Sequence, residues 1–290
     1  MKKLRRTMLF MPGNNPGMLQ NAGILGADSI ILDLEDAVSL TEKDSARVLV
    51  REAIKNVDYS NVEVVVRINP LTTEFADEDI DVIARVKPDT IMVPKATEEE
   101  LIEIDRRLTK IEEEEGFEIG SIKLFPIAES AYGVENIYSI IKSSKRVAGV
   151  LLGGEDYTSD MGIKRTKAGE EVFYARNRVA IACKAAKVDA IDTPFTDTND
   201  LDGLLVDTAK AKSLGMTGKA SINPRQIDGI HSVYAPTKEE IKHAVRVLEA
   251  MEEAQKEGKG VFSLDGKMVD APIINRAKTT VELAKILGLL

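Results

Sequence analysis

The sequence is poor in the side chains that carry most covalent and transition-metal chemistry. It has one cysteine, Cys183, two histidines, His231 and His243, and no tryptophan. One cysteine excludes an internal disulfide framework and a cysteine-rich metal site, and it fits a reducing cytoplasm. A Ser-His-Asp or Cys-His arrangement would have to use one of the two histidines. We therefore expect chemistry based on Asp, Glu, Arg and Lys, a composition that suits a hard cation such as Mg²⁺.

Long apolar runs and excess positive charge are also missing. No apolar run approaches the roughly 20 residues that span a bilayer. The basic, then apolar, start of the chain meets Pro12 and Gly13 at once, so no signal peptide fits. The net charge of −9 disfavours generic binding to nucleic acid or anionic membranes.

What is present is a regular alternation of strand and helix patterns. Helical periodicity marks Lys43–Val57, Thr97–Glu115 with a Thr97/Glu100 capping box, Val134–Ile141 and Val172–Ala186. Between the helical segments lie eight short, β-branched apolar runs: Thr7–Met11, Asp28–Leu34, Glu63–Ile68, Thr90–Val93, Ile122–Ile127, Arg146–Leu152, Asp189–Asp192 and Met216–Ser221. Eight βα units predict a (β/α)8 TIM barrel, with an open doubly wound sheet as the alternative. No Gly-x-Gly-x-x-Gly motif follows the first strand, so dinucleotide binding has no support.

The pattern changes after the eighth strand. A charged amphipathic helix is predicted over Pro236–Glu257 from a Thr237 cap, then a type I′ hairpin at Asp265-Gly266, and a last helix over Pro272–Leu287. We therefore divide the chain into a barrel, residues 1–235, and a C-terminal extension, residues 236–290. The extension looks too short for a core of its own, so we expect it to pack on the barrel or on a neighbouring subunit.

Polar residues gather just past the predicted strands, where barrel enzymes carry their active sites. No comparable cluster of acids and bases is evident at the opposite strand ends, and this asymmetry predicts an enzyme. The residues at or just past the ends of the first six predicted strands are, in order, Pro12 and Gly13; Asp33, Glu35 and Asp36; Arg67, Asn69 and Pro70; Pro94 and Lys95; Glu129 and Ser130; and Gly153, Gly154, Glu155 and Asp156.

Glu129 and Asp156 end neighbouring strands, so their carboxylates are the predicted ligands of one hard cation. The alternative is that Asp156 merely caps the following turn. Arg67 is a predicted bidentate clamp for a substrate carboxylate. Its alternative is a structural ion pair with Asp33, Glu35 or Asp36, and both can hold.

The remaining candidates are less specific. Glu35 and Asp36 could bind metal-bound waters or orient Arg67, or could be a simple charge pair at a helix N-terminus. Lys95 could neutralise an anion, form a Schiff base or be structural, and we favour an anion contact. His231, His243 and Cys183 fall outside the strand ends and are interpreted as structural.

Several motifs together resemble the citrate lyase beta subunit and its relatives, the malyl-CoA, citramalyl-CoA and HpcH/HpaI-type lyases. The resemblance covers nearly the whole chain, and Asn223-Pro-Arg and Ser263-Leu-Asp-Gly-Lys-Met-Val-Asp point to the citrate lyase branch. The shared motifs begin at Arg5 (RRTMLFMPGN), Asp33 (DLEDAV), Val66 (VRIN), Ile127 (IAES) and Leu152 (LGGEDY).

The resemblance implies a Mg²⁺-dependent lyase that cleaves a citryl thioester to oxaloacetate and an acetyl thioester. It implies metal ligands at Glu129 and Asp156 and a substrate carboxylate on Arg67. It also implies partner alpha and gamma subunits, the gamma subunit carrying the thioester. The segment around Asp270 resembles one that reaches a neighbouring subunit's site with a catalytic acid or base, which predicts an oligomer; alternatively, Asp270 is only a helix cap. A stand-alone malyl-CoA or citramalyl-CoA lyase and a non-catalytic scaffold subunit are the rival interpretations.

Overall fold

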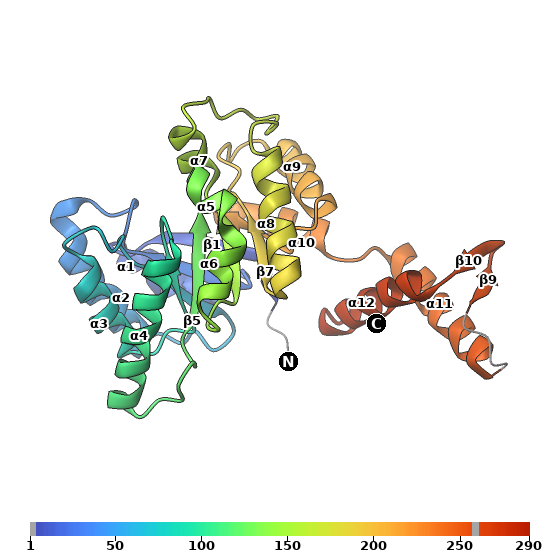
Figure 1. The fold of residues 1–290 in the computed structure, drawn as a ribbon, viewed down its shortest axis with the longest axis horizontal. Coiled ribbons are helices and arrows are strands. Elements are labelled where there is room, and N and C mark those ends of the chain that lie inside the picture. Colours follow the sequence, from blue (N-terminus) through green and yellow to red (C-terminus); the bar gives the residue numbers. More distant parts are fainter. Residues whose placement is uncertain (1–3, 257–260) are drawn as a thin grey trace. The chain divides into compact units, whose positions relative to one another are not determined.

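Eight parallel strands close into a barrel in the computed structural model, which describes residues 4–256 and 261–290. Each strand pairs with the next along the chain, and β1 closes the ring on β8 through Thr7 opposite Lys219. The predicted TIM barrel is confirmed, and Figure 1 shows helices around its strands. The strands are β1 (Thr7–Pro12), β2 (Ser29–Asp33), β3 (Glu63–Arg67), β4 (Thr90–Val93), β5 (Lys123–Ala128), β6 (Gly149–Leu152), β7 (Asp189–Asp192) and β8 (Gly218–Ser221).

The helices follow the expected periodicity with one exception. Thr97 and Glu100 form the predicted capping box of α4. The single helix expected over Val134–Ile141 is instead two short helices, because α5 ends at Glu135 and α6 begins after Asn136. Around the barrel lie α1 (Pro16–Asn21), α2 (Lys43–Asn56), α3 (Ala76–Ala84), α4 (Glu98–Glu115), α5 (Ala131–Glu135), α6 (Ile137–Ser143), α7 (Gly154–Asp160), α8 (Phe173–Ala186), α9 (Leu201–Ser213) and α10 (Ile227–Tyr234), with short 3-10 turns η1 (Ala22–Ile24), η2 (Leu40–Glu42) and η3 (Pro224–Gln226).

The barrel interior is a packed core rather than a channel. One apolar cluster takes side chains from all eight strands, including Met8, Ile31 and Phe125, each fully buried. Two larger clusters fill the space between strands and helices, and one of them contains Cys183, which is 1% exposed as expected for a core residue. The filled interior leaves the strand ends as the place for chemistry.

The expectation that the N-terminal strand ends lack a cluster of acids and bases is wrong. They do carry paired acids and bases: Arg5 donates to both Glu63 oxygens at 2.7 Å and to Asp189 at 2.7 Å. Arg6 is bidentate on Asp28, and His231 Nε2 lies 2.8 Å from Thr7 Oγ1. These groups pair with one another across sequence separations of up to 224 residues, so the sequence around any one strand does not show the pairing. They close the bottom of the barrel.

The C-terminal residues form a second compact unit, Ser232–Leu290, while the first ends at His231. It contains α11 (Lys238–Lys256), β9 (Phe262–Leu264), β10 (Lys267–Val269) and α12 (Ala271–Ile286). The expectation that this segment has no core is wrong, because Val247, Val269 and Val281 are buried in an apolar cluster of its own. Its packing on the barrel or on a neighbouring subunit stays a prediction.

Local signals in this unit are confirmed. Asp265 and Gly266 have φ of 53° and 75°, the left-handed pair that a type I′ turn requires. Thr237 and Glu240 exchange the two hydrogen bonds of a capping box before α11. The predicted end of this helix at Glu257 and the following Gly258-Lys259-Gly260 lie outside the described residues. None of the helices in the described part of the chain is long and apolar enough to cross a membrane.

Candidate active site

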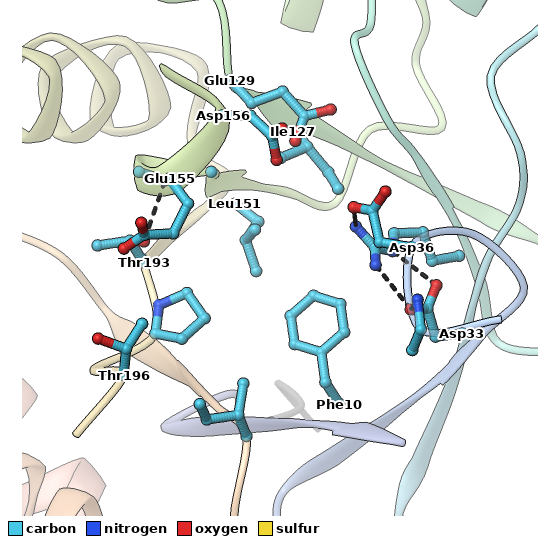
Figure 2. A pocket seen from close by; sticks show the side chains of 16 residues that line it. Phe10, Asp33, Asp36, Ile127, Glu129, Leu151, Glu155, Asp156, Thr193 and Thr196 are labelled. Atoms are coloured by element: carbon cyan, nitrogen blue, oxygen red, sulfur yellow. Dashed lines mark hydrogen bonds and ion pairs between the residues drawn. The ribbon is translucent and has the colours of Figure 1, made fainter. Parts of the chain in front are cut away.

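A cavity of about 390 Å³ opens at the C-terminal ends of the barrel strands (Figure 2). Its walls come from residues within β1 and at or near the ends of β2, β3, β5, β6, β7 and β8. Arg67, Glu129 and Asp156 all line it, together with the apolar side chains of Phe10, Ile127, Leu151 and Ile222. The structure therefore brings the main predicted site residues of the barrel into one cavity.

Glu129 follows β5 and is only 4% exposed. Its Oε1 accepts a 2.6 Å hydrogen bond from the peptide N–H of Lys95. A Cβ at position 153 would lie 2.6 Å from the Glu129 Cβ and 2.8 Å from its Oε2, so the close packing here requires glycine. Burial, and then the negative charges of Glu35 and Asp156, raise the pKa of Glu129 to about 8.

Asp156 lies on the first turn of α7. Figure 2 shows its carboxyl group close to that of Glu129. The N-cap of α7 is Gly153, so Asp156 does not cap this helix and that alternative is wrong. No donor in residues 4–256 or 261–290 hydrogen-bonds to its exposed carboxylate. Gly154 N–H donates to Thr193 Oγ1 at 3.0 Å, which fixes the start of the helix that carries Asp156.

Arg67 ends β3 and is 8% exposed. Its Nε and Nη2 form a bidentate pair with the two Asp33 oxygens at 2.7 and 2.6 Å. Its Nη1 lies 2.7 Å from Glu35 Oε2 and 3.2 Å from Asp36 Oδ2. Phe10 packs against the guanidinium, 5.1 Å from Cζ to the ring centre. The predicted ion pair is confirmed, and the clamp on a substrate carboxylate stays a prediction.

Glu35 and Asp36 lie in a turn between β2 and η2, well before α2 begins at Lys43. They are therefore not a helix N-terminal charge pair. Glu35 Oε2 lies 2.7 Å from Arg67 Nη1 as an ion pair, yet it accepts no hydrogen bond from the residues that the structure describes. Burial raises the pKa of Glu35 to about 7 against the opposing charge of Arg67.

Lys95 reaches the candidate site through its backbone. Its side chain is exposed and is not part of the cavity lining, while its backbone adopts φ of 48°. A lysine rarely adopts this left-handed conformation, which costs about 1 kcal/mol or more. The peptide N–H is what reaches the site, through Glu129. An anion contact by the ammonium group stays a prediction.

Some lining residues were missed by the sequence analysis. Thr193, Pro194 and Thr196 follow β7 and line the cavity, and Phe10 enters from within β1. The strand-end rule could have identified Thr193, because this residue comes directly after the predicted strand Asp189–Asp192. An apolar strand residue such as Phe10 gave no signal, since it resembles any other core position.

Sequence comparison places the chain among known proteins. The profile of the HpcH/HpaI aldolase/citrate lyase family matches residues 6–224. The chain belongs to this family. It is 48% identical to citrate lyase subunit beta of Leuconostoc mesenteroides subsp. cremoris over 284 residues, covering 98% of this chain and 94% of that protein. It is 32% identical to the mitochondrial citramalyl-CoA lyase of Mus musculus, covering 97% and 86% respectively.

A solved structure of the family shares the fold. The citrate lyase beta subunit from M. tuberculosis, complexed with oxaloacetate and magnesium, superimposes with a TM-score of 0.69 at 26% identity. The match covers 80% of this chain and 98% of that one. The family membership expected from the motifs is thus confirmed.

Proposed function

We propose that this chain is a Mg²⁺-dependent carbon–carbon lyase that cleaves a citryl thioester to oxaloacetate and an acetyl thioester, as the beta subunit of a citrate lyase. The observation that carries the proposal is that Glu129 and Asp156 lie close together in a cavity that Arg67 also lines (Figure 2). A cation site and a carboxylate clamp in one cavity suit a substrate that carries both a hydroxyl and carboxylates. The 48% identity to a citrate lyase subunit beta supports the same assignment.

Glu129 and Asp156 are the proposed ligands of Mg²⁺. Their donor atoms are hard oxygens, Glu129 Oε2 faces a glycine that leaves no room for a side chain, and no described residue donates a hydrogen bond to Asp156. The residues 4–256 and 261–290 hold no group of three or more potential ligands of the His, Cys, Asp and Glu types. Two carboxylates fit Mg²⁺, which usually keeps several water or substrate ligands. When bound, the ion would supply Lewis-acid and template chemistry at the substrate hydroxyl and its neighbouring carboxylate.

Other residues of the chain have proposed roles around this pair. Arg67 binds a substrate carboxylate while Asp33 and Glu35 hold its guanidinium in place. Glu35 and Asp36 accept hydrogen bonds from water or substrate beside Arg67. Lys95 contributes its peptide N–H to Glu129, and its ammonium group contacts an anion at the rim. The apolar walls formed by Phe10, Ile127 and Leu151 keep water away from the reacting carbon.

The reaction breaks the bond between the carbinol carbon and the methylene next to the thioester. The hydroxyl proton leaves to a base, the carbinol becomes the ketone of oxaloacetate, and the bonding electrons stay on the methylene as a thioester enolate. A proton then completes the acetyl thioester. Glu129 and Asp156 are committed to the cation, so we assign proton transfer to Asp270 of a neighbouring copy.

Asp270 supports both of its interpretations. It is the N-cap of α12, and its carboxylate accepts from Ile273 N–H at 3.4 Å, so the cap is confirmed. Because this capping hydrogen bond is long, most of the carboxylate's hydrogen-bonding capacity is left for another partner. The catalytic role and the oligomer remain part of the proposal.

The proposal extends to partners and place. We infer a cytoplasmic complex with alpha and gamma subunits, in which the gamma subunit presents the thioester. The alternative is a stand-alone lyase for malyl-CoA or citramalyl-CoA, favoured by the 32% identity to a citramalyl-CoA lyase. A non-catalytic subunit would have no reason to keep Glu129 buried without an ion-pair partner among the described residues.

One assay separates these functions. Oxaloacetate release is measured from citryl-CoA, and ketoacid release from malyl-CoA and citramalyl-CoA, with Mg²⁺ or with EDTA. We expect citryl-CoA to be the preferred substrate, activity to be lost in EDTA, and Asp156→Asn to abolish it without unfolding. A preference for citramalyl-CoA would select the alternative, and full activity in EDTA would refute the metal role.

A further inference from the structure

A buried lysine supports the cavity from behind the turn that carries Glu35 and Asp36. Lys43 is the first residue of α2 and is 5% exposed. Its ammonium nitrogen donates to the carbonyl oxygens of Leu34 at 2.8 Å and Glu35 at 2.7 Å. Within residues 4–256 and 261–290 it forms no ion pair with a carboxylate. A buried ammonium is costly, and such groups are usually paired with an acid.

The two carbonyl groups belong to a turn that several other hydrogen bonds hold in place. Asp33 accepts from the peptide N–H groups of Glu35 and Ala37, at 2.9 and 3.1 Å, as well as from Arg67. Val38 N–H donates to Glu35 O at 3.0 Å, closing the turn. Asn69 Nδ2 adds a second donor to Leu34 O at 3.0 Å.

The turn supplies two of the three acids that contact Arg67, while Asp33 at the end of β2 is the third. Arg67 Nη1 lies within 2.7 Å of Glu35 and 3.2 Å of Asp36, both carried by the turn. Three acidic side chains, Asp33, Glu35 and Asp36, would repel one another without nearby positive charge. Lys43 is a second cation close to these acids, and it reaches the turn through backbone carbonyls rather than through the carboxylates.

We propose that Lys43 is a positioning residue that holds the turn Leu34–Val38, so that Glu35 and Asp36 keep the Arg67 guanidinium aimed into the cavity. Its effect on substrate passes through Arg67, and it touches neither the cation ligands nor the cavity. The part of this inference that concerns substrate binding rests on the proposed function; the part that concerns the turn does not.

The test compares Lys43→Met with Lys55→Met, an exposed lysine on the same helix, in the full chain. Hydrogen exchange of the Glu35, Ala37 and Val38 amides reports the turn directly. Calorimetric titration with oxaloacetate in Mg²⁺ reports Arg67, and titration with Mg²⁺ alone reports Glu129 and Asp156. Lys43→Gln, which keeps two donors without the charge, serves as the second variant if Lys43→Met does not fold.

In Lys43→Met we expect exchange of the three amides to accelerate about tenfold or more, as for loss of hydrogen bonds to a charged donor. Oxaloacetate affinity should fall by about tenfold, while Mg²⁺ affinity changes less than about threefold. Lys55→Met should match the parent, and Lys43→Gln should fall between the two. Unchanged exchange and unchanged oxaloacetate affinity in folded Lys43→Met would overturn the proposal. If the parent itself does not bind oxaloacetate, the proposed function fails, and the exchange measurement alone still decides the role of Lys43.

Discussion

Removing the charge of Glu129 should stabilise the metal-free protein at alkaline pH while destroying its response to Mg²⁺. The pKa of this buried carboxyl is about 8, against an ordinary value of 4.5. A folded-state pKa above the unfolded value gives stability that is present at low pH and is lost as pH rises through the folded pKa. The difference of 3.5 pH units corresponds to at most about 5 kcal/mol at about 1.4 kcal/mol per unit.

The assay is thermal unfolding of the parent, Glu129→Gln and the exposed-site control Glu155→Gln, each in EDTA and in excess Mg²⁺, from pH 5.5 to 8.5. In EDTA the parent should lose stability by several kcal/mol as pH rises towards 8.5, Glu129→Gln should lose much less, and Glu155→Gln should follow the parent. Glu35, with its pKa near 7, adds a smaller total loss of the same sign, which is complete at a lower pH than the loss from Glu129. Mg²⁺ should stabilise the parent most at high pH and leave Glu129→Gln unmoved. Equal pH slopes for the parent and Glu129→Gln in EDTA would refute the reasoning.

Three further predictions follow from the same geometry. Arg67→Lys keeps the positive charge but loses the bidentate pairing with Asp33, so kcat/KM should fall about tenfold or more. An unchanged kcat/KM would show that Arg67 has a structural role only. Gly153→Ala places a methyl group 2.8 Å from Glu129 Oε2, so Mg²⁺ affinity measured by calorimetry should drop about tenfold or more, whereas an unchanged affinity would show that Glu129 can move aside. Asp270→Asn retains a good N-cap, so its Tm should change little while kcat falls at least about tenfold; mixing it with Arg67→Ala after verified subunit exchange should restore part of the activity, and near-normal kcat would leave Asp270 a cap only.

The barrel was predictable because its local signals are strong. Each short apolar run is buried on both faces in the closed sheet, so β4 and β7 begin and end at the residues that the sequence predicted. The capping box at Thr97 fixed the start of α4 in the same way. Such signals depend on neighbours within a few residues, which a single sequence displays in full.

The sequence predicted which residues form the candidate site, but not which of them contact one another. The strand-end rule selected Arg67, Glu129 and Asp156, which the structure brings to one cavity. It could not show that Arg67 is already bidentate on Asp33, or that Lys95 acts through its peptide N–H, because both contacts join residues 34 positions apart. Lys43 escaped notice for a related reason, since its partners are backbone carbonyls that every sequence has.

The acids that line the cavity differ in how many hydrogen bonds the protein donates to them, and this difference indicates where a cation would bind. On one side Asp33 receives four hydrogen bonds, two from Arg67 and two from peptide N–H groups, so its charge is fully satisfied by the protein. On the other side Glu129 has one peptide donor, and Asp156 has none among the described residues. A buried carboxylate beside a second acid, with so little compensation, is costly in the folded protein. The side with Arg67 is built to attract an anion and the side with Glu129 to attract a cation, which is the arrangement that a substrate bearing a carboxylate and a metal-bound hydroxyl requires.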